Sequence, residues 1–510
     1  MHRERFSRIT LLVGVLLAAI SHGELQEIRV GGKIEIYGAS YTDFFAPGEP
    51  LSRHTRFAMR GRPIGPNGTG TTLLADKGIG EGVSFCEQRT RLHVQADFSE
   101  EVSAFVEVDS IDTWGDDFRA STYLRGSDNR ADTSEDVELY QSYLQIDNIR
   151  DTPFSVKIGR QELEFGSGWL VGADPGPDPF TGLSIDAVRV TYSESPFTVD
   201  AWWGKVAESM RDFGQGDRDF YGVYLSYAAA GDMTLDVYWM YLRDEQAIDF
   251  ALSPLSMNLG EFLGISDFHS TNLHTAGLRW SGKREHWDWE AEAAYQWGEA
   301  DALGALFRTY PGLFGDTRAQ YGNWAAHAEF GHTFEATWSP RLFGGLAWYD
   351  GEDRRKVSFG QWLNPFDTPR ASVSFNRLFS TWREDDVVDG WAALTNFWKV
   401  QTGVAVAPTE KLELVAQVRY LQVIAPFYYP ASAVFPWITH KGAADLGWQT
   451  SLYVTYQYSA DVSLNGGYTH FFSGKAIKDG SFIDQNGIQF AGGHGDEDID
   501  YLYGMLTVEF

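Results

Sequence analysis

Residues 287–297 read WDWEAEAAYQW, and the alternation of their side chains indicates the class of fold. Successive side chains of an extended strand point to opposite faces, so one face here is aromatic and apolar while the other is acidic. The first face carries Trp287, Trp289, Ala291, Ala293, Tyr295 and Trp297, and the second carries Asp288, Glu290, Glu292, Ala294 and Gln296. A soluble core would have to bury the carboxylates, which costs too much unless they are paired. The pattern therefore predicts a membrane-spanning strand with one face toward lipid and the other toward water.

The same two-residue period recurs along the whole chain, and no long helical period interrupts it. The predicted strands are Ile34–Tyr41, Glu87–Phe98, Val102–Ile111, Glu138–Asn148, Phe154–Gln161, Ile185–Tyr192, Phe197–Lys205, Asp219–Ala228, Met233–Leu242, Thr271–Trp280, Trp287–Trp297, Gly322–Phe334, Arg341–Asp350, Asn396–Val406, Leu412–Leu421, Gly447–Gln457, Val462–Phe472 and Asp500–Phe510.

The connections between these segments alternate strictly between short and long. The short ones have three to six residues, and the long ones have 13 to 45. A soluble sandwich has no reason to sort its loops in this way, whereas an outer-membrane barrel has tight periplasmic turns and long extracellular loops. We therefore predict an all-β fold, a transmembrane antiparallel up-and-down β-barrel of about 18 strands. The even number of strands places both termini on the periplasmic side.

The two ends of the chain agree with this interpretation. Three arginines precede an apolar run of 12 residues, and small residues follow, which predicts a secretory signal peptide over residues 1–23. Residues 24–510 are predicted to form a single outer-membrane barrel domain. The chain ends YLYGMLTVEF, an alternating strand that closes on Phe510. A terminal strand of this kind is expected to pair with the first strand, to contact outer-membrane lipid and to be recognised by the barrel assembly machinery.

Composition narrows the classes of function. The chain has 70 acidic and 41 basic residues and a net charge of −29, so no nucleic acid is expected as a partner. Its single cysteine, Cys86, rules out an internal disulfide. The histidines are scattered and lie in no nucleophile motif, so we expect no enzyme activity. We predict no cofactor and no metal site, and the pattern makes no prediction of the oligomeric state.

Residues 159–192 read GRQELEFGSGWLVGADPGPDPFTGLSIDAVRVTY. The GRQEL strand end, the Phe165-Gly166 pair, the step from Leu170 to Gly172 and the strand carrying DAVRVTY resemble the alginate-export family of outer-membrane barrels. The preceding ELYQSYLQIDN at 138–148 resembles the strand that comes before this motif in that family. The resemblance implies an 18-stranded barrel that passes a polyuronate or a related anionic polysaccharide outward from the periplasm.

Charged side chains on the water-facing parity are the candidate solute-binding residues. The basic ones are Arg89, Arg91, Lys157, Arg189, Arg279, Lys399 and Arg419. A polyuronate requires separated cations of this kind, because its carboxylates lose water and regain charge-assisted hydrogen bonds. Arg160 joins them from the motif, although its parity is outward. The acidic residues that we assign to the lumen are Asp97, Glu107, Asp109, Glu290 and Glu292.

These charges are unevenly placed among the predicted strands. The first four basic residues lie on strands two to six, and Glu290 and Glu292 lie on strand eleven, roughly across the barrel. This segregation predicts a transverse electric field, but a second interpretation, in which most charges pair with one another, also stays open. Because no predicted periplasmic turn is longer than six residues, any plug must come from the 45-residue loops 42–86 or 351–395. In the second loop, Arg377, Trp382 and Arg383 are candidates for contact with sugars.

Two functions remain open at this stage. Large barrels leave a water-filled channel, so the passage of a hydrophilic solute follows from the fold. The resemblance favours an anionic polysaccharide as that solute. The alternative is a general diffusion porin for small solutes, unrelated to polysaccharide secretion.

Overall fold

A computed structural model describes residues 25–42, 83–114, 137–173, 183–207, 217–229, 232–245, 270–300, 319–351, 374–389, 394–426, 428–430, 439–478 and 498–510. The predicted signal peptide, and with it the predicted division of the chain at residue 23, lies outside these residues. Most of loop 42–86 and part of loop 351–395 also lie outside them.

Eighteen strands form one antiparallel sheet that closes on itself, as predicted. In chain order they are β1 (Glu27–Tyr41), β2 (Val83–Asp97), β3 (Val102–Thr113), β4 (Glu138–Ile146), β5 (Phe154–Glu162), β6 (Ser184–Glu194), β7 (Phe197–Ala207), β8 (Arg218–Ala229) and β9 (Met233–Asp244). The ring continues with β10 (Thr271–Arg284), β11 (Trp287–Ala300), β12 (Ala319–Thr333), β13 (Arg341–Tyr349), β14 (Phe397–Thr409), β15 (Leu412–Val423), β18 (Asp445–Gln457), β19 (Val462–Ser473) and β20 (Ile499–Glu509).

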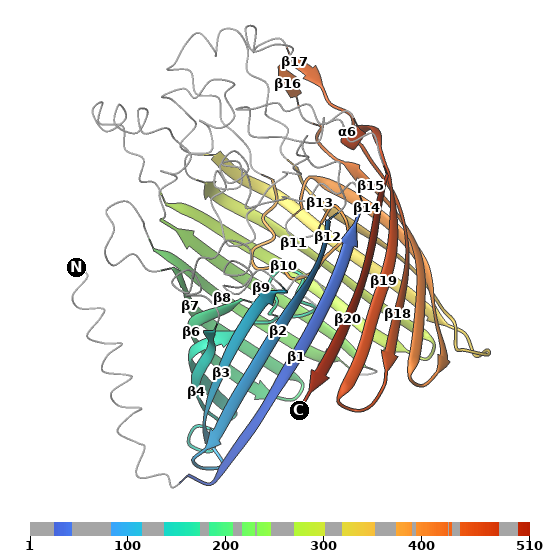
Figure 1. Cartoon of the computed structure of the whole chain (residues 1–510). Coiled ribbons are helices and arrows are strands. Elements are labelled where there is room, and N and C mark those ends of the chain that lie inside the picture. The colour runs from blue at the N-terminus through green and yellow to red at the C-terminus, as the bar shows by residue number, and fades with distance from the viewer. Residues whose placement is uncertain are drawn as a thin grey trace, which may run out of the picture.

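The barrel closes where the last strand meets the first, and the C-terminus lies beside β1 in Figure 1. The backbone of Phe510 both donates to and accepts from Gly32, at 3.0 and 2.8 Å. On the inner face of this seam, the hydroxyl groups of Tyr37 and Tyr501 lie 2.6 Å apart. On the outer face Leu502 is 57% exposed and Phe510 is 63% exposed. The alternation of the terminal strand therefore has the predicted direction.

The connections differ in length at the two ends of the barrel. Every second connection, beginning with the turn from β2 to β3, is a short turn of two to seven residues. The long connections leave the opposite end of the barrel, which is uppermost in Figure 1. This upper end also carries the short hairpin β16 (Tyr428–Pro430) with β17 (Thr439–Lys441) and the one-turn helix α6 (Lys475–Lys478). Several strands extend beyond their predicted bounds. For example, β1 begins at Glu27 because Gly31 and Gly32 interrupt the side-chain pattern without interrupting backbone pairing with β2.

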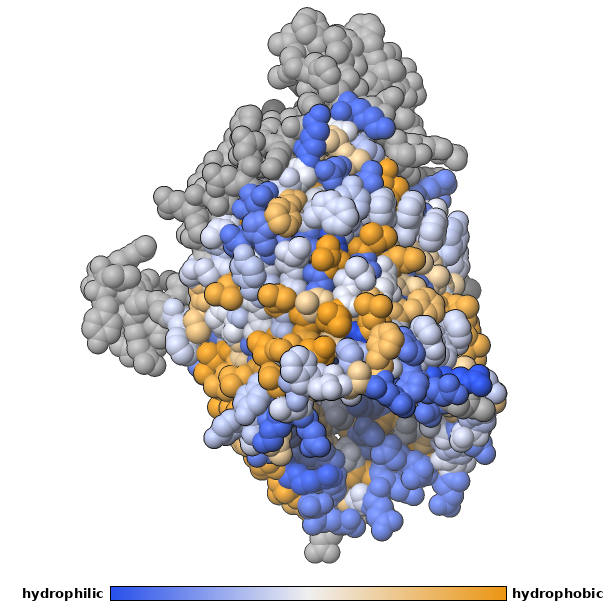
Figure 2. Space-filling view, turned by 90° about the vertical axis from the view of Figure 1, so that its right-hand side faces the viewer, coloured by the Kyte–Doolittle hydropathy of each residue, from blue (hydrophilic) through white to orange (hydrophobic). Residues whose placement is uncertain are grey.

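The outer surface carries an apolar band between hydrophilic ends (Figure 2). Its exposed large side chains include Trp280, Trp287, Tyr295, Trp297, Trp324, Leu342, Leu346, Trp448 and Leu452. Along β11 the predicted alternation is visible, because Tyr295 and Trp297 are exposed while Glu292 and Gln296 are buried. Such a band fits the hydrocarbon core of an outer membrane. Within the part of the chain that the structure describes, no helix is long and apolar enough to cross a membrane.

Candidate functional site

Two loop segments fold back into the barrel and narrow its lumen. The first, residues 163–173, follows β5, and we call it inner loop A. The second, residues 374–389, lies between β13 and β14, and we call it inner loop B. Since β5 and β13 are eight strands apart in one direction around the ring and ten in the other, the two loops enter from nearly opposite walls. Together they cross the channel.

The two inner loops pair with each other through their backbones. The amide of Phe379 donates to the carbonyl of Leu170 at 2.9 Å, and the amide of Gly172 donates back to the carbonyl of Phe379 at 3.0 Å. A third bond joins the amide of Thr381 to the carbonyl of Gly168 at 3.2 Å. Gly172 leaves room for this approach, because a Cβ there would lie 2.0 Å from the hydroxyl oxygen of Thr381. The predicted motif therefore contains a loop-docking surface.

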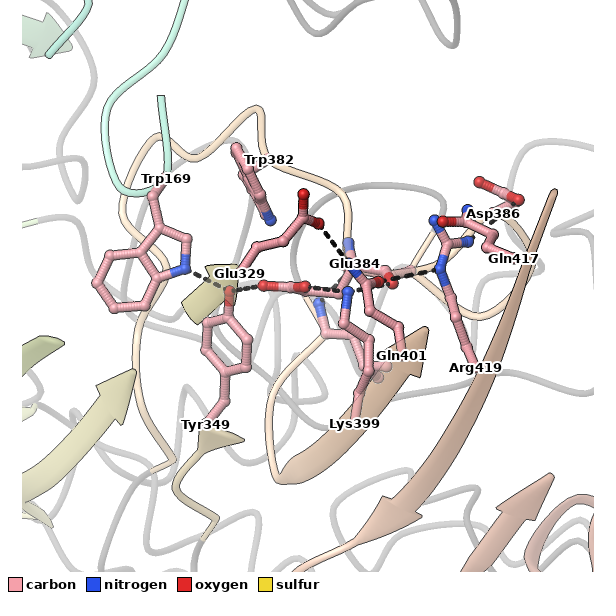
Figure 3. Close-up of polar contacts among 12 residues, drawn as sticks. Trp169, Glu329, Tyr349, Trp382, Glu384, Asp386, Lys399, Gln401, Gln417 and Arg419 are labelled. Carbon is pink, nitrogen blue, oxygen red and sulfur yellow. Dashed lines mark hydrogen bonds and ion pairs between the residues drawn. The ribbon is translucent and has the colours of Figure 1, made fainter. Parts of the chain in front are cut away.

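A row of polar side chains fixes the junction of the loops to the barrel wall (Figure 3). The indole nitrogen of Trp169 in inner loop A donates to the hydroxyl of Tyr349 on β13 at 2.6 Å. That hydroxyl in turn donates to Glu384 of inner loop B at 2.6 Å. The ammonium of Lys399 on β14 lies 2.5 Å from the other oxygen of Glu384. All four side chains are buried, so each bond is made in an environment where losing a partner is costly.

Asp386 fixes inner loop B to a second part of the wall. One of its carboxylate oxygens accepts from Thr469 at 2.8 Å, from Gln449 at 2.9 Å and from Arg419 at 3.3 Å. The hydroxyl of Tyr453 also donates to it. These partners come from β15, β18 and β19, so one loop carboxylate joins three strands. On the other side, Gln296 of β11 exchanges two hydrogen bonds of 2.7 Å with the backbone of Asn376.

Inner loop B has a buried core of its own. Phe375, Leu378 and Phe379 are each at most 2% exposed. Arg377 is wholly buried, and its guanidinium lies 2.6 Å from Asp389 and 4.7 Å from the ring centre of Tyr349. Arg377 therefore holds the loop together rather than contacting a solute, which corrects the expectation from its sequence context.

Trp382 and Arg383 were the other two candidates for contact with sugars. Both are half-buried. The ring of Trp382 lies 4.9 Å from that of His327, and the guanidinium of Arg383 donates to the carbonyl of Asp386 at 3.1 Å. Both side chains thus serve contacts within the protein.

Two neighbouring carboxyl groups of inner loop B have opposite pKa shifts. Burial, followed by the adjacent carboxylate of Asp386, raises the pKa of Asp385 from 3.8 to about 6. Burial alone would also raise the pKa of Glu384, but Lys399, assisted by His327 and Arg377, lowers it to about 2. The docked loop thus keeps Glu384 ionised and makes Asp385 bind its proton more tightly than a carboxyl group in water does.

The predicted basic residues of β2 to β6 lie on the inner wall. Arg89 makes a bidentate contact with Asp109, with its closest approach 2.6 Å. Arg91 stacks on Tyr140 at 4.5 Å and lies 3.7 Å from Asp109. Predicted acidic Glu107 is buried on the same wall and accepts from Gln141 at 2.8 Å.

Lys157 and Arg189 face each other directly across β5 and β6. The ammonium of Lys157 lies 4.3 Å from the ring centre of Tyr143, and the guanidinium carbon of Arg189 lies 5.2 Å from that of Phe165 in inner loop A. Arg189 also bonds Asp200 at 2.8 Å. Among the described carboxylates, none lies within ion-pair distance of Lys157.

The remaining predicted basic residues, Arg279, Lys399 and Arg419, are also paired with acids. Arg279 bonds Asp236 at 2.9 Å and Glu290 at 3.2 Å. Lys399 and Arg419 bind carboxylates of inner loop B, as described above. These contacts match the second interpretation of the charges, in which wall bases and acids pair locally, more closely than a clean separation of the two signs.

Two predicted residues lie away from the narrowed lumen. Arg160 points outward, because it falls between the inward-facing Gly159 and Gln161. Its side chain is exposed and pairs with the exposed Asp186 at 3.0 Å. It is therefore not part of the inner wall. Asp97 lies at the last residue of β2, beside the short turn, and bonds Arg29 at 2.5 Å.

The sequence analysis assigned no role in the site to four residues that organise it. Trp169, Gln296, His327 and Tyr349 all lie at the junction of the inner loops with the wall. Gln296 and His327 had a usable signal, since both share the inward parity of predicted strands. Trp169 had none, because its partner Tyr349 is 180 residues away in the chain.

A closed 18-stranded ring, an apolar outer band and a polar lumen narrowed by inward-folded loops define an outer-membrane channel of the porin type. Residues 75–487 match the family model described as Alginate export, and the chain belongs to that family. No curated protein sequence matches this chain significantly.

Solved structures show the same fold at low sequence identity. OccK11 (OpdR) of Pseudomonas aeruginosa is 11% identical, with 96% of this chain and 98% of that chain covered and a TM-score of 0.50. OccAB2 of Acinetobacter baumannii is 9% identical, with 96% and 99% covered and a TM-score of 0.51. The chain is therefore an outer-membrane protein whose fold is shared with these barrels.

Proposed function

We propose that this outer-membrane channel passes an anionic saccharide of the uronate class, and that Lys157 and Arg189 form its principal solute contact. The observation that carries the proposal is the placement of these two cations directly opposite each other on the inner wall. Like charges in such a position destabilise a sheet. Only Arg189 has an ion-pair partner among the described residues, Asp200, so the pair retains a net positive charge for an anion.

The surroundings of these cations also suit a sugar acid. Tyr143 and Phe165 provide ring faces beside Lys157 and Arg189, respectively. A uronate combines an apolar ring face with a carboxylate, so aromatic and cationic groups in one place complement both parts. Phe165 belongs to inner loop A, which places this contact beside the narrowed part of the lumen. Membership of the alginate-export family supports the same class of solute.

Ion selectivity and block in planar lipid bilayers test this proposal. We expect the reconstituted channel to prefer anions and oligouronates to block its current. Because a hydrogen bond to a charged group contributes about 1.5–3 kcal/mol, Lys157→Gln and Arg189→Gln are each expected to weaken the block roughly tenfold to a hundredfold. Arg160→Gln is the matched control, since Arg160 lies on the same strand but points outward. Cation preference without oligouronate block would refute the proposal.

A second candidate is a general diffusion porin for small solutes. The observation that favours it is the anchoring of inner loop B by buried ion pairs, which gives a fixed aperture rather than an open tube. Two measurements together separate the two candidates: swelling of liposomes in neutral and acidic sugars, and block of the current by oligouronates of increasing length. Equal passage of neutral and acidic sugars of one size favours the porin, whereas a block that strengthens with oligouronate length favours successive contacts with a polyanion.

A further inference from the structure

Three potential metal ligands meet on the inner wall, behind the junction of the two inner loops. Glu290 and Glu292 are two residues apart on β11 and share a face, and His327 of β12 lies directly opposite Glu292. One ligand atom from each of these three side chains lies within 4.8 Å of those of the other two. Nε2 of His327 and Oε2 of Glu292 are 3.8 Å apart. Zinc binds such atoms at about 2.0–2.2 Å, so the three side chains would move closer together around the ion when it binds.

Two buried ligand atoms of this cluster have no hydrogen-bond partner. His327 is 4% exposed and Glu292 is 6% exposed. Nε2 of His327 and Oε2 of Glu292 are both buried and have no hydrogen-bond partner. Buried polar atoms nearly always have a hydrogen-bond partner, so two facing atoms without one need an explanation. A bound cation would satisfy both at once.

The local charge leads to the same conclusion. The carboxylates of Asp236, Glu290 and Glu292 share the guanidinium of Arg279, at 2.9, 3.2 and 4.0 Å. With neutral His327, this group carries a formal excess of two negative charges in a largely buried corner. Uncompensated buried charge is costly, and one divalent cation would balance it.

The surrounding residues already hold the ligands in position. The hydroxyl of Tyr238 donates to the other oxygen of Glu292 at 2.7 Å, and Arg279 bonds both oxygens of Glu290 at 3.2 Å. The imidazole of His327 lies between Trp169, at 5.0 Å, and Trp382, at 4.9 Å. Such outer contacts orient metal ligands and tune their affinity.

We propose that Glu290, Glu292 and His327 bind a divalent transition metal of the zinc class inside the channel. The imidazole nitrogen favours zinc over calcium or magnesium, which prefer oxygen ligands. Because Trp169 belongs to inner loop A and Trp382 to inner loop B, the metal fixes the wall residue on which both loops rest. This proposal goes beyond solute passage and does not depend on the identity of the solute.

Metal binding is tested with untagged, chelator-treated protein in detergent. After incubation with Zn²⁺ and gel filtration, we expect one zinc per chain by elemental analysis. Glu292→Gln keeps the shape and the Tyr238 contact, and His327→Ala removes the imidazole; each should weaken Zn²⁺ affinity at least tenfold in calorimetry. Co²⁺ should give visible absorption bands that His327→Ala abolishes. His93→Ala is the matched control, since His93 is a half-buried wall histidine that stacks on Phe105 and lies outside the cluster.

Heat-modifiable mobility on gels confirms that each variant is folded, and Glu292→Gln keeps the test decisive if His327→Ala does not fold. Equal zinc content in the wild type and in both variants would overturn the proposal, as would a folded wild-type protein that retains no zinc. Tyr238→Phe, which removes only the orienting hydroxyl, should weaken Zn²⁺ binding less than Glu292→Gln does. Binding of Ca²⁺ or Mg²⁺ with higher affinity than Zn²⁺ would also contradict it.

Discussion

Replacing Asp389 with Asn is expected to loosen inner loop B without unfolding the barrel. The change removes the negative charge that neutralises the wholly buried guanidinium of Arg377, 2.6 Å away. Breaking one partner of a buried ion pair costs about 3–5 kcal/mol. Arg377 also donates to the carbonyl of Leu394 at 3.3 Å, so we expect the lower end of this range. About 3 kcal/mol multiplies the population of the undocked loop by roughly 150.

Single-channel recording in planar bilayers measures this change, because undocking of inner loop B widens the lumen. We expect brief high-conductance events to become roughly a hundred times more frequent in Asp389→Asn. The double variant Arg377→Met with Asp389→Asn removes the unpaired charge and keeps an acceptor for one of the two amides, those of Glu384 and Leu394, that donate to separate oxygens of Asp389. It should lie closer to the wild type than the single variant does. A single variant with wild-type traces, or a double variant more disturbed than the single one, would refute this reasoning.

Three further perturbations act on other parts of the structure. The pKa of Asp385, raised by burial and an adjacent carboxylate from 3.8 to about 6, means that the docked loop binds this proton more tightly than the undocked loop, so docking weakens as pH rises through 6. We expect about tenfold more undocked loop at pH 7 than at pH 5 in protease-protection assays, and Asp385→Asn should abolish this difference. Gly172→Ala should separate the inner loops and raise conductance, and adding Thr381→Ala should partly restore the wild type, since a Cβ at 172 meets the Thr381 hydroxyl. Deleting Phe510 removes two backbone bonds to Gly32 and should lower the yield of folded, heat-modifiable barrel in the outer membrane.

The barrel could be predicted from the sequence because its rule is local. Alternate residues of a strand predict its water-facing and lipid-facing sides, as Glu292 and Tyr295 do on β11. The length of a connection predicts the side of the membrane on which it lies. This rule applies to each strand by itself, without information about which other residues it contacts. The same rule correctly leaves Arg160 outside the lumen, whereas the resemblance alone had included it.

The site could be predicted only in part, because its contacts are not local. Parity placed Lys399 and Arg419 on the inner wall, but it could not show that Glu384 and Asp386 of inner loop B occupy them. A sequence context rich in basic and aromatic residues made Arg377 look like a sugar contact, although it neutralises a buried acid. Side chains that are far apart in the chain and meet only when a loop docks leave no pattern in a single sequence.

The excess of acidic residues is compatible with an anionic solute once their partners are known. Carboxylates of inner loop B bind the cations of β14 and β15, so those cations hold the loop and are not available to a solute. Lys157 and Arg189 face each other on β5 and β6, and of these two only Arg189 has an ion-pair partner among the described residues, which makes them the proposed contact for an anion. β5 and β6 are the strands that inner loop A joins, and Phe165 of that loop stacks on Arg189. The stretch from 159 to 192 therefore contains inner loop A and Arg189, and Lys157 lies two residues before it, so one short segment of the chain supplies both the proposed solute contact and the loop beside it.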